Sequence, residues 1–215
     1  MRVGGILEKI ILIGDSGHSK VIEDSVKSRG GLVIAKLDDK YQKSIYEHQV
    51  LKGPINRIEE ILEDDIRVVI AIGSNYIRKQ LVERLALPLE KYAKVIHKST
   101  IISDSTEIGF GTVVMPGVIV NADVTIGNHA IVNTNCVIEH DCIIGNYVHV
   151  SPTATLTGNV VVGEGSHIGA GATVIPGIEI GSWTNVGAGS SVISNIESNT
   201  TAVGVPAKVI KREVF

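Results

Sequence analysis

The segment "VIEHDC", residues 137–142, places an ionisable pair, His140 and Asp141, inside a run of aliphatic residues. A histidine titrates near neutral pH, so His140 could accept a proton from an incoming amine or hydroxyl group. The adjacent carboxylate of Asp141 would hold the imidazole ring and favour its protonated form. We therefore take His140 and Asp141 as the candidate catalytic pair, and the surrounding chain must explain how they are held.

A six-residue repeat surrounds this pair and continues through the C-terminal half of the chain. Stepping by six from Ile96 to Val192 reaches a branched aliphatic residue every time, and the register never slips. A period of six fits neither an α-helix nor a simple hairpin. It is typical of a parallel β-helix, in which short strands stack into coils. Aromatic residues make up only 4% of the chain, which agrees with an interior too narrow for rings.

The repeat also predicts which side chains stack. Three hexads would close one triangular coil, so residues 18 apart should lie above one another, separated by about 4.8 Å. On this spacing His140 has Ala122 below it and Gly158 above it, and such small neighbours leave room for a substrate. His149 and His167 share another column, half a coil away. A rigid prism cannot bring the two columns together, so a site that uses both would need two chains.

Residues 1–94 follow a different pattern, in which buried strands alternate with helices. Strands are expected at "KIILIG", "GLVIAKLDD" and "VVIAIG", and helices at "HSKVIEDSVKSRG", "NRIEEILEDD" and "SNYIRKQLVERL". The last helix has Ile77, Leu81 and Leu85 along one side, which we expect to be buried. This alternation predicts a small Rossmann-like α/β domain with a parallel sheet. Residues 95–215 then form the β-helix domain and a C-terminal tail.

Two strand ends in residues 1–94 carry side chains suited to a phosphorylated ligand. The turn "GDSGHSK", residues 14–20, opens a helix, where free N–H groups and the helix dipole favour phosphate. The turn lacks the full dinucleotide-binding fingerprint, and a plain tight turn explains it equally well. Asp38 and Asp39 end the second strand, where such folds often bind a ribose or a base, although a solvated loop is the alternative. Arg78 and Lys20 could add positive charge, or could be solvated on a helix surface.

Composition limits the classes of partner. The net charge is −3 and basic residues form no long block, so we expect neither nucleic acid nor a membrane surface as a partner. The opening segment is too short and interrupted for a signal peptide or a spanning helix, so we expect a cytoplasmic protein. Cys136 and Cys142 fit neither a zinc motif nor a disulfide framework, and we expect buried free thiols. The histidines lack the close pair of a zinc-dependent hexapeptide enzyme, so we expect no metal.

Several motifs, taken in order, resemble one known family. The segments are "GDSGHSKVIED", "LDD", "AIGSNYIRKQ", "NTNCVIEHDC", "HVSPTATLTGNV" and "VGVPAK". Together they look like the sugar O- and N-acyltransferases related to sialic acid O-acetyltransferase and to bacterial UDP-4-amino-sugar N-acetyltransferases. The resemblance covers nearly the whole chain. It implies a nucleotide-sugar-binding N-terminal domain and a left-handed β-helix that forms a homotrimer and binds acetyl-CoA between subunits.

The resemblance also implies parts for individual residues. His149 would contact acetyl-CoA, and the backbone at Ala170 and Ala188 would line the same slot. Asn133 matches a polar residue near the active site, with a turn asparagine as the alternative. His167 carries no family role, and we expect it at an interface or on the surface. The residues implied to contact the nucleotide sugar are Ser16, Gly17 and His18 on the phosphate side, Asp38 and Asp39 on the base side, and Gly73 after the third strand.

These inferences lead to an acetyl-CoA-dependent N-acetyltransferase. It would act on the amine of a nucleotide-linked amino sugar of the UDP-4-amino-4,6-dideoxy type, for cell-surface glycan synthesis. The amine would attack the thioester carbonyl, His140 would accept its proton, and backbone N–H groups would stabilise the oxyanion. Two alternatives stay open: sugar O-acetylation, as for sialic acid, and a non-catalytic sugar-nucleotide-binding scaffold. The intact His140–Asp141 pair favours catalysis, and an acceptor screen would separate N- from O-transfer.

Overall fold

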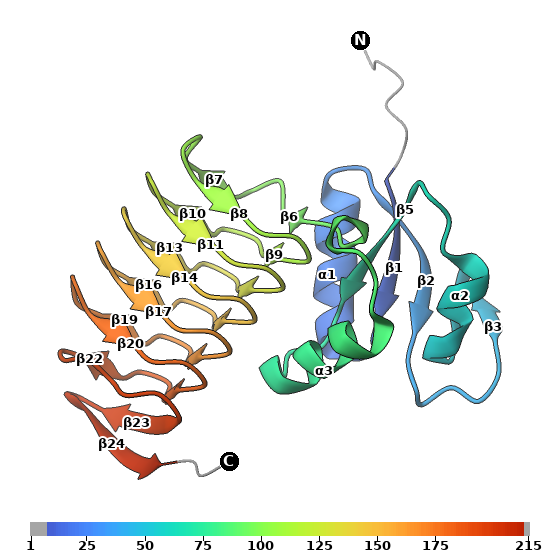
Figure 1. The fold of residues 1–215 in the computed structure, drawn as a ribbon. Helices are drawn as coiled ribbons and strands as arrows, with labels where there is room; N and C mark the ends of the chain where they lie inside the picture. The colour runs from blue at the N-terminus through green and yellow to red at the C-terminus, as the bar shows by residue number, and fades with distance from the viewer. Residues whose placement is uncertain (1–7, 213–215) are drawn as a thin grey trace.

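The chain folds into an α/β domain followed by a stack of triangular coils (Figure 1). The computed structural model describes residues 8–212. Residues 1–7 and 213–215, which belong to the outer ends of the two predicted domains, lie outside the described residues. The predicted order, a parallel-sheet α/β domain and then stacked parallel sheets of a hexapeptide β-helix, is confirmed.

A five-stranded sheet forms the centre of the α/β domain, in the order β3-β4-β2-β1-β5. All neighbouring strands are parallel except the β3–β4 hairpin, which was not expected. Alternate residues of β1 point into two separate apolar clusters, so the sheet is covered on both faces. The strands are β1 Lys9–Ile13, β2 Leu32–Leu37, β3 Ile45–Glu47, β4 Val50–Gly53 and β5 Ile66–Ile70.

One predicted helix of this domain is much shorter than expected. The segment expected to be one helix over residues 56–65 forms a 3₁₀ turn and a single α-turn, because Leu62 adopts an extended ψ of 106°. An acidic run follows at residues 63–65, and negative charge is unfavourable at a helix C-terminus. The helices are α1 Gly17–Ser28, α2 Ile58–Ile61 and α3 Asn75–Leu85, and the 3₁₀ turns are η1 Ile55–Arg57 and η2 Leu89–Lys91.

The buried face of α3 also differs from the predicted one. Ile77 was expected in the core, but its side chain is 46% exposed. Leu81 and Leu85 contact the core as expected, together with Val82. The fourth member of this face is Arg78, which is 1% exposed. The helix therefore turns a charged residue, and not an aliphatic one, toward the rest of the molecule.

The β-helix is built from three sheets of two-residue parallel strands, and a longer antiparallel hairpin over residues 200–212 ends the third sheet. Residues of successive coils pair 18 positions apart, as Val132 does with Val150, except that Asn185 pairs with Thr201. One sheet contains β7 Ile101–Ile102, β10 Ile119–Val120, β13 Val137–Ile138, β16 Thr155–Leu156, β19 Thr173–Val174 and β22 Ser191–Val192. The second contains β8 Glu107–Ile108, β11 Thr125–Ile126, β14 Ile143–Ile144, β17 Val161–Val162 and β20 Glu179–Ile180. The third contains β6 Val95–Ile96, β9 Val113–Val114, β12 Ile131–Val132, β15 His149–Val150, β18 His167–Ile168, β21 Asn185–Val186, β23 Thr200–Gly204 and β24 Ala207–Arg212.

The interior of the coils is aliphatic, and the two cysteines belong to it. One continuous cluster of buried Val, Ile, Leu and Ala residues follows the axis and includes Cys136 and Cys142. Both thiols are free. Burial raises the pKa of Cys136 to about 12, so this thiol is not nucleophilic at neutral pH. The expectation of buried free thiols is confirmed.

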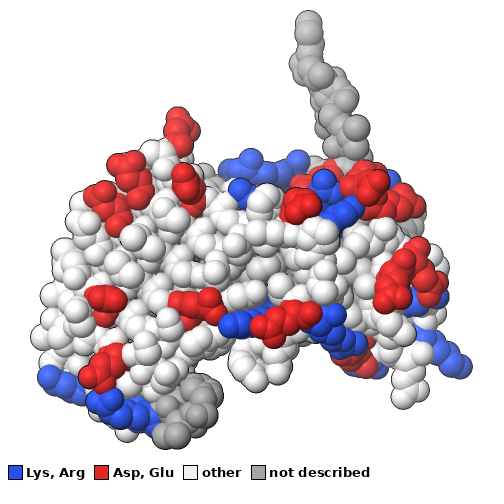
Figure 2. Space-filling model, viewed as in Figure 1, with Lys and Arg blue, Asp and Glu red and all other residues white. Residues whose placement is uncertain are grey.

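The two domains share a core at their junction. Val95, Val113 and Met115 of the first coils belong to the same apolar cluster as Ile10 and Leu12 of β1. On the face shown in Figure 2, acidic and basic side chains lie beside one another over the α/β domain, and no extended basic surface is visible there. Among the described residues, no helix is long and apolar enough to cross a membrane.

Candidate active site

The predicted catalytic pair lies on an exposed corner of the β-helix. His140 and Asp141 connect β13 to β14, and each side chain is about half exposed. The His140 Nδ1 atom and the Asp141 Oδ2 atom are 2.7 Å apart. With the carboxylate ionised, Nδ1 carries the proton and Nε2 is left as the basic nitrogen. The pair can therefore accept a proton at Nε2 while Asp141 stabilises the imidazolium that forms.

The neighbouring coils fix the backbone of this pair and leave space for its ring. The Asp141 N–H donates to the Ala122 carbonyl at 3.0 Å, and the Asn159 N–H donates to the His140 carbonyl at 3.0 Å. A Cβ atom at Gly158 would lie 2.6 Å from Cε1 of His140. The absence of a side chain at Gly158 therefore accommodates the imidazole itself, and any larger residue there would displace it.

A second group of histidines lies on the sheet that faces the α/β domain. His149 and His167 stack with ring centroids 4.9 Å apart. The Asn133 Nδ2 atom is 3.0 Å from Nε2 of His149, while the Asn133 Oδ1 atom accepts the Thr134 N–H at 2.8 Å. An amide nitrogen only donates, so Nε2 of His149 accepts. Burial, helped by His167 and the positive charge of Arg78, lowers the pKa of His149 from 6.5 to about 3, which keeps the ring neutral.

His167 lines a pocket, and its expected place at an interface or on the surface stays a prediction. Its half-buried ring forms part of the pocket wall together with His149. Its Nε2 atom is 2.6 Å from the Ser151 Oγ atom. Burial lowers the pKa of His167, and the nearby charge of Arg78 lowers it further. The six-residue period alone does not predict that the α/β domain packs beside this column.

The N-terminus of α1 approaches the stacked rings of His149 and His167, which we call the His149 wall. Ser16 precedes the helix without capping it through its side chain, and no atom lies within 4 Å of a Cβ position at Gly17. The rings of His18 and His149 are 6.3 Å apart. Burial, and then the charge of Arg78, lower the pKa of His18 to about 4, and its buried Nε2 atom has no hydrogen-bond partner among the described residues. A polar ligand group would satisfy this atom.

The two carboxylates expected on the base side are engaged within the protein. Asp38 accepts the N–H groups of Asp15 at 2.9 Å and Lys40 at 3.0 Å. It thereby fixes the turn that leads into α1. Asp39 pairs with Arg84 of α3, with a nitrogen–oxygen distance of 2.6 Å, on the surface. Asp38 is therefore placed to shape the turn, whereas Asp39 is available only if its ion pair opens.

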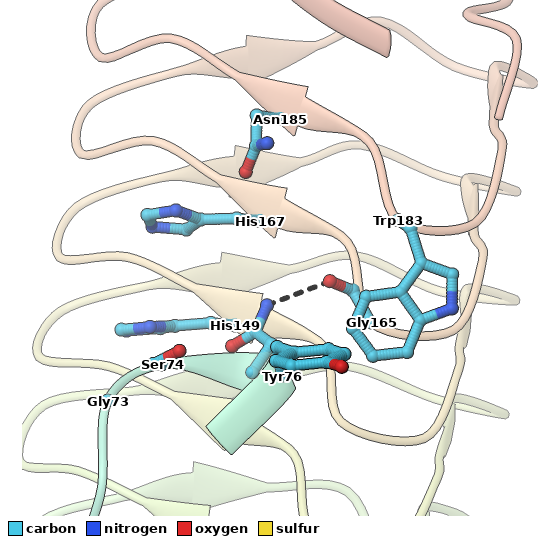
Figure 3. A pocket seen from close by; sticks show the side chains of 9 residues that line it. Gly73, Ser74, Tyr76, His149, Gly165, His167, Trp183 and Asn185 are labelled. Carbon is cyan, nitrogen blue, oxygen red and sulfur yellow. Dashed lines mark hydrogen bonds between the residues drawn. The ribbon is translucent and has the colours of Figure 1, made fainter. Parts of the chain in front are cut away.

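A pocket between the two domains brings several predicted residues together (Figure 3). Its volume is about 570 Å³. Gly73 and His149, which were assigned to different ligands, both line it, and Tyr76 and Trp183 form an edge-to-face pair 6.4 Å apart. Ala170 and Ala188 lie just after β18 and β21, outside its lining. The lining residues are Gly73, Ser74, Asn75, Tyr76, His149, Gly165, His167, Trp183 and Asn185.

His140 lies apart from this pocket within one chain. It occupies the corner between the sheet of β13 and the sheet of β14, whereas His149 belongs to the third sheet. The chain therefore presents a proton-accepting pair on one side and a ligand-sized pocket on another.

Comparison with known proteins places both parts in one family. Residues 9–85 match the PglD N-terminal domain, and residues 105–140 and 123–158 match the bacterial transferase hexapeptide (six repeats). The acetyltransferase domain of PglB from Neisseria gonorrhoeae FA1090 is 34% identical with a TM-score of 0.85, over 94% of this chain and 100% of that one. PerB from Caulobacter crescentus, solved with CoA and GDP-perosamine, is 36% identical with a TM-score of 0.86, over 97% and 98%.

The chain belongs to the PglD-like hexapeptide-repeat sugar N-acetyltransferases. Its sequence is also 46% identical over 112 residues to UDP-N-acetylbacillosamine N-acetyltransferase of Bacillus subtilis (strain 168). That match covers 51% of this chain and 52% of the relative, about half of each. The family resemblance inferred from the motifs is thereby confirmed.

Several pocket residues of this family member were not predicted. Ser74, Asn75 and Tyr76 directly follow β5 and its turn, a position that often carries function in α/β domains. Trp183 is the single tryptophan and lies 18 residues after Gly165, so the coil spacing could have placed it beside the pocket. No group of three or more His, Cys, Asp or Glu residues that could hold a metal ion occurs within residues 8–212.

Proposed function

We propose that this chain transfers the acetyl group of acetyl-CoA to the amine of a nucleotide-linked amino sugar. The acceptor class is a UDP-4-amino-4,6-dideoxy sugar, and the product is used to build cell-surface glycans. The reaction takes place in the cytoplasm. The observation that carries the proposal is the His140–Asp141 pair, which leaves a basic Nε2 atom on an exposed corner. The neutral His149 wall provides a separate place for ligands, together with the turns at Gly17 and Gly73, where no atom lies within 4 Å of the Cβ position.

The proposed chemistry is direct transfer. The amine attacks the thioester carbonyl, and Nε2 of His140 takes the proton that the nitrogen loses. The tetrahedral intermediate then collapses, the carbon–sulfur bond breaks, and the CoA thiolate leaves with the proton returned by the imidazolium. Asp141 stabilises the imidazolium between these two steps. The charge on the oxyanion is stabilised by backbone N–H groups.

The known structures support both ligands. The PglB acetyltransferase domain has been solved in complex with acetyl coenzyme A, and PerB with CoA and GDP-perosamine. The Bacillus relative is named for a UDP-linked amino sugar. We assign His149 to acetyl-CoA, with Ala170 and Ala188 on the same slot, and the turns at Ser16, Gly17, His18 and Gly73 to the nucleotide sugar, with Asp38 and Asp39 on its base side.

We further propose that the active unit is a homotrimer. His140 and His149 lie on different sides of one rigid prism, so one site can use both only if a second chain supplies one of them. A three-sided prism with closed symmetry favours three subunits. Light scattering at micromolar concentration tests this directly, because a fully active monomer would refute the two-chain site.

An acceptor screen tests the activity itself. Release of the CoA thiol is measured with UDP-, GDP- and dTDP-linked amino sugars, and with sialic acid as the oxygen acceptor. We expect thiol release with an amino sugar nucleotide and none with the same nucleotide carrying a hydroxyl sugar. Turnover of sialic acid alone would assign O-acetylation, and binding without turnover of any acceptor would assign a scaffold.

A further inference from the structure

Arg78 is a buried cation whose contacts link the two domains. Its side chain is 1% exposed, and no carboxylate is paired with it among the described residues. Burial lowers its pKa to about 9, so the guanidinium is charged at neutral pH. All of its acceptors are carbonyl or amide oxygens. They are the carbonyls of His129 (from Nε, 2.7 Å), Tyr147 (from Nη2, 2.7 Å), Ile72 and Gly73 (from Nη1, 3.1 and 3.2 Å), and Oδ1 of Asn75 (from Nη2, 3.0 Å).

The acceptors on the β-helix form a regular row. His129, Tyr147 and Gly165 are 18 residues apart, so they occupy one corner in three successive coils, and all three have left-handed φ angles of 54°, 58° and 70°. We call their three carbonyl oxygens the carbonyl row. Arg78 donates to the first two, and Asn75 Nδ2 donates to the third at 2.9 Å. Coils stack at about 4.8 Å, which a planar guanidinium spans with two of its nitrogens.

The same guanidinium also holds the turn before α3. Its bonds to the carbonyls of Ile72 and Gly73 tie that turn to the carbonyl row. Gly73 has no side chain and no atom within 4 Å of its Cβ position, so the turn is not held by packing at this residue. Gly73 and His149 line one pocket. The position of this turn relative to the His149 wall therefore depends on Arg78.

We propose that Arg78 is a positioning residue for acetyl transfer: by bonding both the carbonyl row and the Gly73 turn, it sets the distance between the nucleotide-sugar turn and the His149 wall. This inference rests on the proposed function, because it needs one ligand on each side. Domain docking alone does not require a fully buried charge, since Lys79 joins the same helix to Glu164 by a half-buried ion pair. A buried guanidinium without a carboxylate is costly, and a packed apolar residue would stabilise the junction better.

The test replaces Arg78 by lysine, which keeps the charge but cannot bond two carbonyls of the row together with the turn. We expect Arg78→Lys to raise the KM for the amino-sugar nucleotide about tenfold and to leave the KM for acetyl-CoA within about twofold, because His149 belongs to the β-helix frame. Asn75→Ala, which removes the third bond, should move the same KM in the same direction by less.

The matched control is Arg29→Lys. Arg29 also donates to a β-helix carbonyl across the domain junction, from Nε to the Ile96 oxygen at 2.7 Å, but far along the chain from the pocket turn. We expect it to leave both KM values unchanged. An equal effect of Arg29→Lys, a parallel rise of both KM values in Arg78→Lys, or wild-type kinetics in Arg78→Lys would each overturn the inference.

A readout that needs no turnover separates this inference from the proposed function. Trp183 is the only tryptophan, and its ring meets Tyr76, two residues before Arg78. Its emission therefore reports how the start of α3 sits against the coils. We expect a changed Trp183 emission maximum in Arg78→Lys and none in Arg29→Lys. Failure of every acceptor to react would refute the function, whereas an unchanged emission in Arg78→Lys would refute the positioning role.

Discussion

The His140 corner and the His149 wall hold histidines in opposite environments. His140 is half exposed and bonded to the carboxylate of its neighbour, Asp141. His149 and His18 are half-buried, near the charge of Arg78 and with no carboxylate bonded to either ring among residues 8–212, and their pKa values are lowered to about 3 and about 4. The first environment places a carboxylate beside the ring, and the second keeps rings neutral. Residue type alone therefore does not separate a base from a binding surface.

Replacing the exposed histidine should have the largest effect. We expect His140→Ala to lower kcat by roughly 10²- to 10⁴-fold, the usual contribution of a general base, with little change in either KM. His97→Ala is the control, because His97 is another histidine of the β-helix domain, half-buried, whose ring is hydrogen-bonded to Ser99 among the described residues. Steady-state kinetics on both variants decide the matter. Near-normal kcat in His140→Ala would show that His140 is not the general base, so the His140 corner would have no catalytic role that the His149 wall lacks.

The carboxylate of the corner can be neutralised without disturbing the turn. Asp141 has a φ of 60°, and asparagine also tolerates this left-handed conformation. Asp141→Asn should therefore fold normally and lower kcat by about 10- to 100-fold, because the imidazolium loses its counter-charge. Unchanged kcat, with a melting temperature equal to wild type, would show that His140 acts without Asp141.

The neutral rings should make the folded state sensitive to acid. Burial, and then the charge of Arg78, lower the pKa of His129 from 6.5 to about 4, and neither ring nitrogen has a partner among the described residues. Below pH 6.5 the unfolded chain gains a proton here that the folded chain does not, so stability falls until about pH 4. This one group should remove about 2 kcal/mol between pH 7 and pH 5.

Phenylalanine at this position would remove the titration while keeping the ring between Tyr92 and Tyr147. Urea unfolding of His129→Phe should show a shallower loss of the free energy of unfolding between pH 7 and pH 5. His97→Ala is again the control and should retain the slope that His129 contributes, because it leaves the buried ring of His129 in place. An identical slope in His129→Phe and wild type would mean that the buried ring does not titrate differently from an exposed one.

The smallest expected effects concern the two aspartates after β2. Asp38→Ala removes the acceptor of two N–H groups in the turn beside α1, so we expect a several-fold rise in the KM for the sugar nucleotide and none for acetyl-CoA. Asp39→Ala breaks only a surface ion pair and should change either constant by less than about twofold. Calorimetric titration with the nucleoside diphosphate checks both, and the reverse ranking would assign the base contact to Asp39.

The corner was predictable from sequence because its geometry is local. The six-residue period specified the coils, and adjacency placed Asp141 beside His140. The 18-residue spacing likewise identified Gly158 as the residue above the ring, and its closeness to His140 agrees.

The wall was less predictable because it depends on contacts between distant residues. Asn75 meets Gly165, and Arg78 meets Tyr147, across the domain junction. Helical periodicity predicted that Ile77 would be buried, because aliphatic residues usually form the buried face of a helix. The neighbouring Arg78 is buried instead, and no pattern in the sequence indicated that backbone carbonyls would bind its guanidinium. The β3–β4 hairpin was not predicted because β3 has only 3 residues and all of them are exposed, so the strand shows no alternation of buried and exposed positions.

The carbonyl row raises the question of how α3 selects one coil among many similar ones. Backbone oxygens recur in every coil, so they alone would let α3 dock at several equivalent heights. The side chains at the row differ: His129 stacks on Tyr147, Gly165 has none, and Trp183, one coil further, carries an indole. A Cβ at Gly165 would lie 2.5 Å from that indole. Moving α3 up by one coil would set Asn75 against Trp183 in place of Gly165, the position of the row without a side chain. These few residues thus distinguish one coil as the place where α3 docks.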